Sequence, residues 1–213
     1  MKTCIIFGAG GHAKMVIELI RLIGNISIAG LIDNDINKHG TQVMGCTVIG
    51  SDADLTEIAK EVDYFVLGIG GIGNPKIRKI VYNIAKDHHL KPLTLVHPSA
   101  IVSSYATLGE GCQIMPNAII NVDAVLGDNV LINTGAVVEH ESFVGAHTHI
   151  ASKACLLGNV TVGEETLIGG NSTIRQGLTI GSLAVVGMGS VVTKNVPDAC
   201  TVVGVPARKI KEN

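Results

Sequence analysis

A six-residue repeat governs the second half of the chain. Every sixth residue from position 96 to position 192 is Ile, Leu or Val, seventeen times in succession without a slip or insertion. The residue four places later is usually small, with seven Ala, three Ser and two Thr, and Val, Cys or Leu at the remainder. Self-similarity at a short fixed period is the signature of a solenoid and excludes an ordinary globular core for this half. The seventeen positions are Val96, Val102, Leu108, Ile114, Ile120, Leu126, Ile132, Val138, Val144, Ile150, Leu156, Val162, Ile168, Ile174, Ile180, Val186 and Val192.

The repeat predicts a parallel β-helix over residues 96–213. One aliphatic side chain per short strand would point inward, and the small residue would lie at the adjoining tight corner. Glycines often follow the aliphatic position, and we expect them where the backbone turns sharply. These glycines are Gly109, Gly127, Gly145, Gly163, Gly169, Gly181 and Gly187.

Composition fits such a solenoid and excludes several function classes. The 213 residues are 16% charged and 3% aromatic, and 26 of them are Gly. A formal net charge of −2 predicts no nucleic-acid partner. The longest apolar run near the start, Cys4 to Phe7, is too short for a signal peptide or membrane insertion. The five cysteines are scattered and form no Cys-x-x-Cys pair, which favours reduced thiols in a cytoplasmic protein.

Residues 1–95 have a different pattern, which alternates strands and helices. Apolar segments at 3–7, 27–32 and 64–69 predict three short strands, the third followed by a glycine-containing stretch. Helical spacing of apolar residues occurs between Ala13 and Ile23 and between Ile77 and Ile84. This alternation predicts a small parallel sheet of βαβ units, a Rossmann-like half-domain of α/β class.

The first predicted strand leads into a glycine-rich turn. Gly8-x-Gly10-x-x-Ala13, with Asp33 after the second strand, satisfies the dinucleotide fingerprint, in which glycines let a helix N-terminus approach a pyrophosphate. About 95 residues allow only one mononucleotide half, so a nucleoside diphosphate sugar is an alternative to a nicotinamide cofactor. A turn that needs glycine only for packing is the third interpretation.

Titratable residues gather at one place in the repeat. Glu139, His140 and Glu141 are followed closely by His147 and His149. A histidine beside a carboxylate can serve as a general base, because the carboxylate stabilises the imidazolium. A solvated corner of the solenoid is the alternative, and a zinc site of three histidines is another, although the gaps of seven and two residues do not suit it.

Adjacent residues on a flat strand point to opposite faces of the sheet. His140 and Glu141 can therefore cooperate only near a corner, where this alternation breaks. They precede the small residue Ser142, which is consistent with a corner.

The motifs together resemble the PglD/NeuD family of sugar acetyltransferases, in order and along the whole chain. The resemblance implies a left-handed β-helix with three hexads per coil, behind an α/β domain, with the boundary between 95 and 96. The matching segments are Gly8–His12, Asp33-Asn34, Gly70 before Ile77-Arg78-Lys79, His97–Ala100, Asn133-Thr134, Val138–Glu141, His149, Gly158–Val160 and Val203–Ala207.

The resemblance also implies a reaction. An acetyl group would pass directly from acetyl-CoA to the 4-amino group of a UDP-linked amino-dideoxy sugar for bacterial glycan biosynthesis, with no metal. His140 would be the general base, and Glu141 would raise its basicity. His149, Gly170 and Met188 would contact acetyl-CoA. The UDP-sugar would be held by Gly10, Gly11, His12, Asp33, Asn34 and Gly70.

Three alternatives stay open from the sequence. A related branch is associated with O-acetylation of sialic acid, and a non-catalytic UDP-sugar-binding protein would keep the same glycine turn. An acyl-enzyme on Cys155 would replace direct transfer by ping-pong kinetics. The resemblance further implies a homotrimer with active sites between subunits. The open end of a β-helix needs a cap, and we expect the tail at 203–210 to close it, with Arg208 and Lys209 able to reach the 3′-phosphate of CoA.

Overall fold

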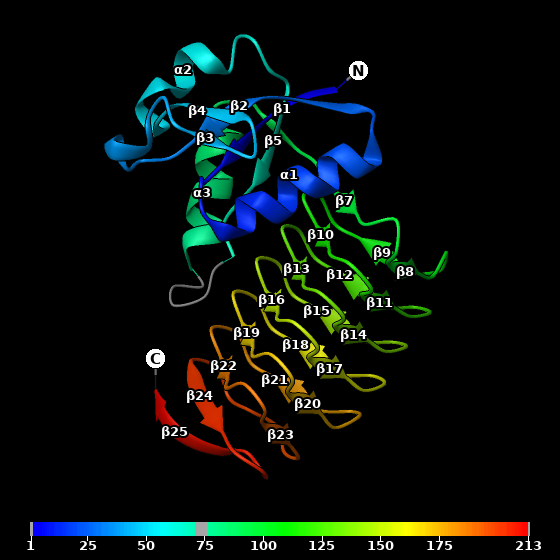
Figure 1. Cartoon of the computed structure of the whole chain (residues 1–213). Coiled ribbons are helices and arrows are strands. Elements are labelled where there is room, and N and C mark those ends of the chain that lie inside the picture. The colour runs from blue at the N-terminus through cyan, green and yellow to red at the C-terminus, as the bar shows by residue number, and fades with distance from the viewer. Residues whose placement is uncertain (1, 71–75, 213) are drawn as a thin grey trace. The chain divides into compact units, whose positions relative to one another are not determined.

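The computed structural model of the protein describes residues 2–70 and 76–212. These residues divide into two compact units, one made of residues 2–70 and 77–95 and the other of residues 96–212. Figure 1 labels the helices and strands of both units. The glycine-containing stretch at 71–75, which follows the third predicted strand, lies outside the described residues.

The first unit is an α/β domain built on a six-stranded sheet with the order β3-β4-β2-β1-β5-β6. All neighbouring strands are parallel except the β3–β4 hairpin. The strands are β1 (Lys2–Phe7), β2 (Ile26–Ile32), β3 (Gln42–Val43), β4 (Cys46–Gly50), β5 (Tyr64–Leu67) and β6 (Lys91–Pro92). The helices are α1 (Gly11–Ile23), α2 (Leu55–Ile58) and α3 (Lys76–Asp87), with 3-10 turns η1 (Ile36–Lys38) and η2 (Asp52–Asp54).

The predicted βαβαβ half-domain is confirmed, and its core contains aromatic rings in edge-to-face contact. Phe65 packs edge-to-face against Phe7 and against Tyr82, with ring centroids 5.9 and 5.5 Å apart. The structure adds β3, β4 and β6, which the sequence did not predict. β4 was missed because it is five residues long and only Val48 and Gly50 in it are buried, so it has no clear apolar period.

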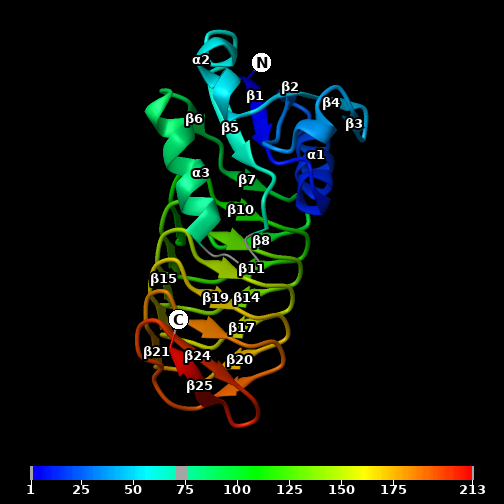
Figure 2. The ribbon, with the colours of Figure 1, turned by 90° about the vertical axis from the view of Figure 1, so that its left-hand side faces the viewer.

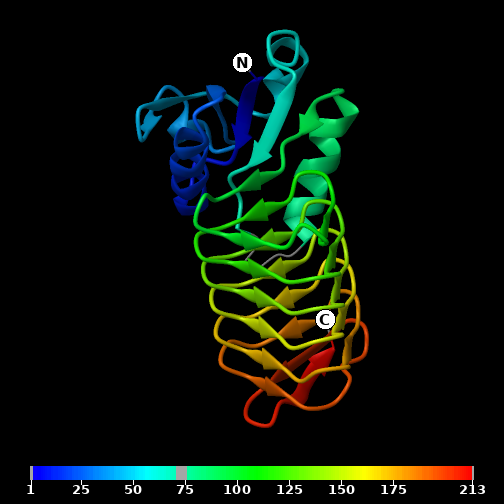
Figure 3. The ribbon, with the colours of Figure 1, turned by 90° about the vertical axis from the view of Figure 1, so that its right-hand side faces the viewer.

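The second unit is a parallel β-helix whose strands form three sheets, with two residues in every strand except the last two, β24 and β25 (Figures 2 and 3). Sheet C contains β7 (Leu95–Val96), β10 (Gln113–Ile114), β13 (Leu131–Ile132), β16 (His149–Ile150), β19 (Leu167–Ile168), β22 (Val185–Val186), β24 (Cys200–Val203) and β25 (Arg208–Glu212). Sheet D contains β8 (Ile101–Val102), β11 (Ile119–Ile120), β14 (Val137–Val138), β17 (Cys155–Leu156), β20 (Thr173–Ile174) and β23 (Val191–Val192). Sheet E contains β9 (Thr107–Leu108), β12 (Val125–Leu126), β15 (Phe143–Val144), β18 (Thr161–Val162) and β21 (Thr179–Ile180).

One coil of this β-helix consumes three hexads. Leu131 pairs with Gln113 before it and with His149 after it, so stacked residues are 18 apart. The chain therefore visits sheets C, D and E in turn, and the predicted left-handed parallel β-helix is confirmed. The final strand, β25, runs antiparallel to β24 and ends the stack.

The inward aliphatic positions form the continuous core of the β-helix. From Ile114 to Val192 every one of them is buried, with at most 1% exposed. Each such side chain contributes roughly 1.5–3 kcal/mol by leaving water. The buried corner hydroxyls are also satisfied, since Thr148 and Thr166 donate to the carbonyls of Gly163 and Gly181 at 2.8 Å.

The reason predicted for the glycines after the aliphatic positions is wrong. None of these seven has a positive φ. A Cβ on Gly109 would instead lie 2.5 Å from the carbonyl carbon of Gly127, and one on Gly145 would lie 2.6 Å from the nitrogen of Glu164. These glycines are thus required by the close stacking of successive coils.

The sharp turn lies two residues further on. At fourteen consecutive corners the third residue after the aliphatic position has a left-handed φ, a conformation that favours Gly and Asn. Four Gly and four Asn occupy these positions, but Glu141, His147, Lys153, Glu165 and Leu183 occupy others.

No helix in the described part of the chain combines the length and the hydropathy needed to span a bilayer.

Candidate functional site

The turn between β1 and α1 contains two glycines that the fold itself does not require. Gly8 has a φ of +97°, and a Cβ there would lie 2.9 Å from Cγ1 of Ile69, so its role is structural. Gly10 and Gly11 have ordinary φ values, and a Cβ on either would meet nothing within 4 Å. Gly10 is the N-cap of α1 and offers no side-chain cap. The first turn of α1 therefore presents backbone N–H groups beside open space, an arrangement that suits an anion.

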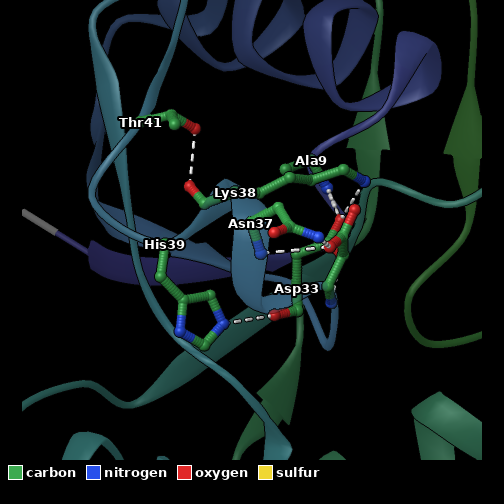
Figure 4. A network of polar contacts seen from close by, with 7 residues as sticks. Ala9, Asp33, Asn37, Lys38, His39 and Thr41 are labelled. Atoms are coloured by element: carbon green, nitrogen blue, oxygen red, sulfur yellow. Dashed lines mark hydrogen bonds and ion pairs between the residues drawn. The ribbon is translucent and has the colours of Figure 1, made fainter.

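Asp33, at the end of β2, is the centre of a polar network next to this turn (Figure 4). Its Oδ2 accepts hydrogen bonds from the Ala9 N–H and from Lys38 Nζ, both at 2.9 Å. Its Oδ1 accepts from the Asp35 N–H at 3.0 Å. The ring Nε2 of His39 lies 2.8 Å from the Asp33 carbonyl oxygen. The network joins the glycine turn to the segment after β2.

The pKa of Asp33 lies below its ordinary value. Partial burial acts to raise this pKa, but the hydrogen bonds from Asp35, Lys38 and Ala9 and the positive charge of Lys38 outweigh it. The carboxylate is therefore ionised at neutral pH. Lys38 and His39 were missed by the sequence analysis, and their only signal there was a pair of basic residues just after the strand-end acid.

The other predicted nucleotide-binding residues of this unit have distinct surroundings. Gly70 and His12 are neighbours, since a Cβ on Gly70 would lie 3.9 Å from that of His12. Asn34 is engaged within the fold: its Nδ2 donates to Asp52 Oδ2 at 2.7 Å, and its Oδ1 accepts the Asp52 N–H at 3.0 Å. This reciprocal pair fixes the start of η2, so the Asn34 amide has a structural role.

The corner between β14 and β15 contains the predicted base. His140 and Glu141 lie in the turn, as expected for two adjacent residues that cooperate, and Nδ1 of His140 is 3.0 Å from Oε2 of Glu141. Glu141 has the left-handed φ of 59°. Both side chains are more than half exposed. Because the carboxylate accepts from Nδ1–H, the lone pair of the imidazole is on Nε2.

Two further residues buttress this corner. Oε2 of Glu139 accepts a hydrogen bond from Nδ2 of Asn121 at 2.9 Å and a weaker one from the His140 N–H at 3.4 Å. Asn121 was missed because it lies one coil of 18 residues before Glu139 and is not itself titratable, so it does not belong to the cluster of titratable residues in the sequence. Nearby, burial and the charge of Glu139 raise the pKa of the Cys155 thiol, which disfavours a nucleophilic thiolate.

His149 and His147 lie elsewhere on the coil. His149 faces outward on β16 between Leu131 and Leu167, yet it is only 3% exposed. Its Nε2 lies 3.2 Å from Nδ2 of Asn133. His147 occupies the next corner, where its Nδ1 lies 3.0 Å from Nδ2 of Asn129. Within residues 2–70 and 76–212, no three His, Cys, Asp or Glu side chains are grouped to hold a metal ion.

Gly170 and Met188 occupy equivalent places in successive coils, at the corner between sheets C and D. Met188 is 85% exposed. A Cβ on Gly170 would lie 3.1 Å from the carbonyl oxygen of Ser152, one coil earlier. His140 lies at the other edge of sheet D, so one side of the triangular coil, roughly 15–20 Å long, separates it from these two residues.

Comparisons with known sequences agree with the two-unit architecture. Residues 3–85 match the PglD N-terminal domain, residues 105–140 match a bacterial transferase hexapeptide model of six repeats, and residues 159–194 match a hexapeptide repeat of succinyl-transferase. A curated relative, the UDP-N-acetylbacillosamine N-acetyltransferase of Bacillus subtilis (strain 168), is 36% identical over 118 residues. That match covers 54% of this chain and about half of the relative, 52%.

Solved structures extend the similarity to the whole chain. PerB from Caulobacter crescentus, in complex with CoA and GDP-perosamine, is 36% identical with a TM-score of 0.92, over 99% of this chain and 98% of that one. The acetyltransferase domain of PglB from Neisseria gonorrhoeae FA1090, in complex with acetyl coenzyme A, is 34% identical with a TM-score of 0.89, over 98% and 99%. With the matched domains, the shared fold and this level of identity, the chain belongs to the PglD/NeuD family of hexapeptide-repeat sugar acetyltransferases.

Proposed function

We propose that this protein transfers the acetyl group of acetyl-CoA to the 4-amino group of a UDP-linked amino-dideoxy sugar. The observation that carries the proposal is the His140–Glu141 pair, held at 3.0 Å on an exposed corner of a chain from a family of sugar acetyltransferases. Nε2 of His140 has a lone pair that can accept a proton, and the Glu141 carboxylate stabilises the imidazolium that forms. Removal of a proton from an amine requires both.

The reaction is a direct transfer within a ternary complex. The sugar amine attacks the thioester carbonyl carbon while Nε2 of His140 takes a proton from the nitrogen. A backbone N–H stabilises the oxyanion of the tetrahedral intermediate. The C–S bond then breaks, CoA leaves as a thiolate, and the proton on the imidazolium passes to that thiolate or to water. Because a thiolate leaves readily, positioning and proton removal are sufficient.

The raised pKa of Cys155 argues against an acyl-enzyme route. A nucleophilic cysteine needs an electropositive setting that lowers its pKa, whereas this thiol is partly buried beside Glu139. Direct transfer therefore remains the proposal, and Cys155 has no chemical part in it.

The acetyl-CoA site is proposed to include His149, Gly170 and Met188. Since Gly170 and Met188 lie at the opposite edge of sheet D from His140, we propose that a neighbouring copy completes the site within a homotrimer. The outward side chains of sheet D support this assembly because they are largely apolar: Ile101, Ile119, Val137, Cys155 and Val191. A monomeric mass in light scattering would argue against a site between copies.

The nucleotide is proposed to bind at the turn after β1. The open space at Gly10 and Gly11 suits a pyrophosphate, and His12, Asp33 and Gly70 lie around the same turn. Asn34 would contribute through the segment that it fixes. The Bacillus subtilis relative is named for a UDP-sugar, whereas PerB was crystallised with a GDP-sugar. The choice of UDP therefore rests on the family resemblance of the sequence motifs.

A cytoplasmic setting accompanies the proposal, because none of the five cysteines, all within the described residues, forms a disulfide, which suits a reducing compartment. Two other functions are tested beside it. O-acetylation of free sialic acid would use the same base, and a non-catalytic UDP-sugar-binding protein would use only the first unit.

A thiol-release assay with acetyl-CoA separates these functions. The panel contains UDP-linked and GDP-linked 4-amino sugars, their 4-hydroxy counterparts and free sialic acid. We expect CoA release with the UDP-linked 4-amino sugars, with the N-acetyl product identified by mass spectrometry. CoA release with sialic acid but with none of the nucleotide sugars would instead indicate O-acetylation. Binding of UDP-sugar with no release from any acceptor would favour the non-catalytic protein.

A further inference from the structure

The imidazole of His140 lies against a glycine of the next coil. Gly158 is 18 residues after His140 and therefore directly adjacent in the stack. A Cβ on Gly158 would lie 2.5 Å from both Cε1 and Nε2 of His140 and 3.2 Å from its Cδ2. Ordinary contacts of a Cβ begin at about 3.4 Å. Any side chain at position 158 would thus occupy the place of the ring.

The backbone does not account for this glycine. Gly158 is not among the glycines with a positive φ, and the left-handed residue of its corner is Asn159, with φ 55°. The same place is filled by Val122 two coils earlier, by His140 itself one coil earlier and by Gln176 one coil later. A Cβ is therefore compatible with this corner in general, and only the imidazole excludes it at position 158.

The hydrogen bonds around His140 determine which ring atom faces Gly158. Nδ1 is engaged by Glu141, so Nε2 is the nitrogen that can accept a proton. Nε2 is also one of the two ring atoms nearest to the missing Cβ. The two coils are joined here by the Asn159 N–H, which donates to the His140 carbonyl oxygen at 2.8 Å.

We propose that Gly158 is a positioning residue, whose missing side chain provides the space in which Nε2 of His140 is held ready to accept the substrate proton. This inference rests on the proposed function, because it assigns a role through His140. It places no requirement on the identity of the sugar or of its nucleotide.

The test is a double-mutant cycle of Gly158→Ala and His140→Ala. The ring is about half exposed, 53%, so the added methyl can displace it toward solvent while the protein stays folded. We expect Gly158→Ala to lower kcat on the order of 10²-fold, as a misplacement of about 1 Å can do. In the His140→Ala background the same change should have no further effect on the residual rate.

A spectroscopic measurement follows the ring without any substrate. In ¹⁵N-histidine-labelled protein, assigned with His140→Ala, we expect the Nδ1–H tautomer of His140 to be retained in the wild type and lost in Gly158→Ala. Gly177→Ala is the matched control: it adds a methyl to the same corner one coil later, where nothing lies within 4 Å. Because Gly177 has φ +69°, this control should lower stability without changing the His140 tautomer.

The two measurements fail in different ways. An equal loss of rate from Gly158→Ala in both backgrounds, or an unchanged His140 tautomer, would overturn the positioning role. If the wild type releases no CoA with any acceptor, the proposed function fails, and the tautomer measurement still decides whether Gly158 holds the ring.

Discussion

The two candidate binding regions differ in which groups could act on a ligand: side chains at one and backbone N–H groups at the other. At the corner 139–141 the backbone follows the same course as at the other corners of the β-helix, and the side chains make the difference. At the turn after β1 side chains are almost absent, and the backbone N–H groups of α1 are the chemical groups on offer. In the proposed function, the chemistry at the corner is therefore added by side chains to an ordinary backbone, whereas the turn uses backbone groups that also build the fold.

This comparison predicts that a substitution at the corner can abolish activity without lowering the stability of the fold. His140 is about half exposed, and its side-chain bond is to Glu141, which is still more exposed. Removal of the imidazole should therefore leave the aliphatic core intact. At Asp33, where one carboxylate joins the turn to the segment after β2, the two properties should change together.

The largest effect is expected at the corner. His140→Ala should lower kcat by roughly 10²–10⁴-fold, because it removes the proposed general base. The affinity for the nucleotide sugar and the denaturation midpoint should stay near those of the wild type, since the side chain is exposed. Steady-state kinetics, calorimetric titration of the nucleotide sugar and thermal unfolding measure the three properties.

Cys155→Ala is the matched control for this substitution. Its thiol lies near the same corner but has a raised pKa, so we expect kcat within about twofold of the wild type. Near-normal turnover in His140→Ala, or ping-pong kinetics with loss of activity in Cys155→Ala, would contradict the role given to the corner.

A smaller effect is expected from Gly11→Ala at the turn. A Cβ there meets no protein atom within 4 Å, and Ala is the better helix former by about 1 kcal/mol, so stability should be unchanged or higher. If the pyrophosphate occupies that space, KM for the nucleotide sugar should rise about tenfold while kcat is kept. An unchanged KM would show that the nucleotide does not approach Gly11.

Gly68→Ala provides the contrast within the same unit. A Cβ on Gly68 would lie 2.8 Å from Cγ2 of Ile6 and 2.9 Å from the Cβ of Ala13. This overpacking should lower the free energy of unfolding by about 1–3 kcal/mol. The pair distinguishes a glycine needed by the fold from one whose space is open to a ligand.

The repeat made the β-helix predictable, because seventeen aliphatic positions fix the strands and the inward direction together. Corner geometry was not predictable in the same way. Gly109 and Gly111 are both glycines near one corner, yet the first is required by the close approach of the next coil and the second is favoured by its left-handed φ of 71°. A sequence gives the residue type at each position, whereas stacking in three dimensions decides which of the two reasons applies.

The same limit applies to the candidate sites. The pairing of His140 with Glu141 follows from adjacency plus a corner, both visible in the sequence. The contact of Glu139 with Asn121 spans one coil, and the bonds of the Asp33 carboxylate come from two segments, the turn after β1 and the segment after β2. Asn34 illustrates the converse: the resemblance implies a contact with the nucleotide sugar, and the structure adds that both ends of its amide bind Asp52.

The smallest effect, and the one that tests whether function and fold are joined at the turn, is expected at Asp33. Asp33→Asn keeps an oxygen for one N–H but removes the charge that faces Lys38 at 2.9 Å. A hydrogen-bonded charge of this kind contributes about 1–2 kcal/mol to stability. Because the folded-state pKa is lowered, this contribution is present above the unfolded-state pKa of about 3.9 and is lost as pH falls through the folded-state value.

The difference in unfolding free energy between wild type and Asp33→Asn should therefore be constant from about pH 5 to pH 7 and shrink below about pH 4. Urea denaturation across this range measures it, and Lys38→Met is the matched variant, which should reproduce only part of the difference because the Ala9 and Asp35 N–H groups still bind the carboxylate. Affinity for the nucleotide sugar should fall in Asp33→Asn along with stability. A variant that lost affinity but kept full stability at pH 7 would break the comparison, because Asp33 would then be separable from the fold just as His140 is expected to be.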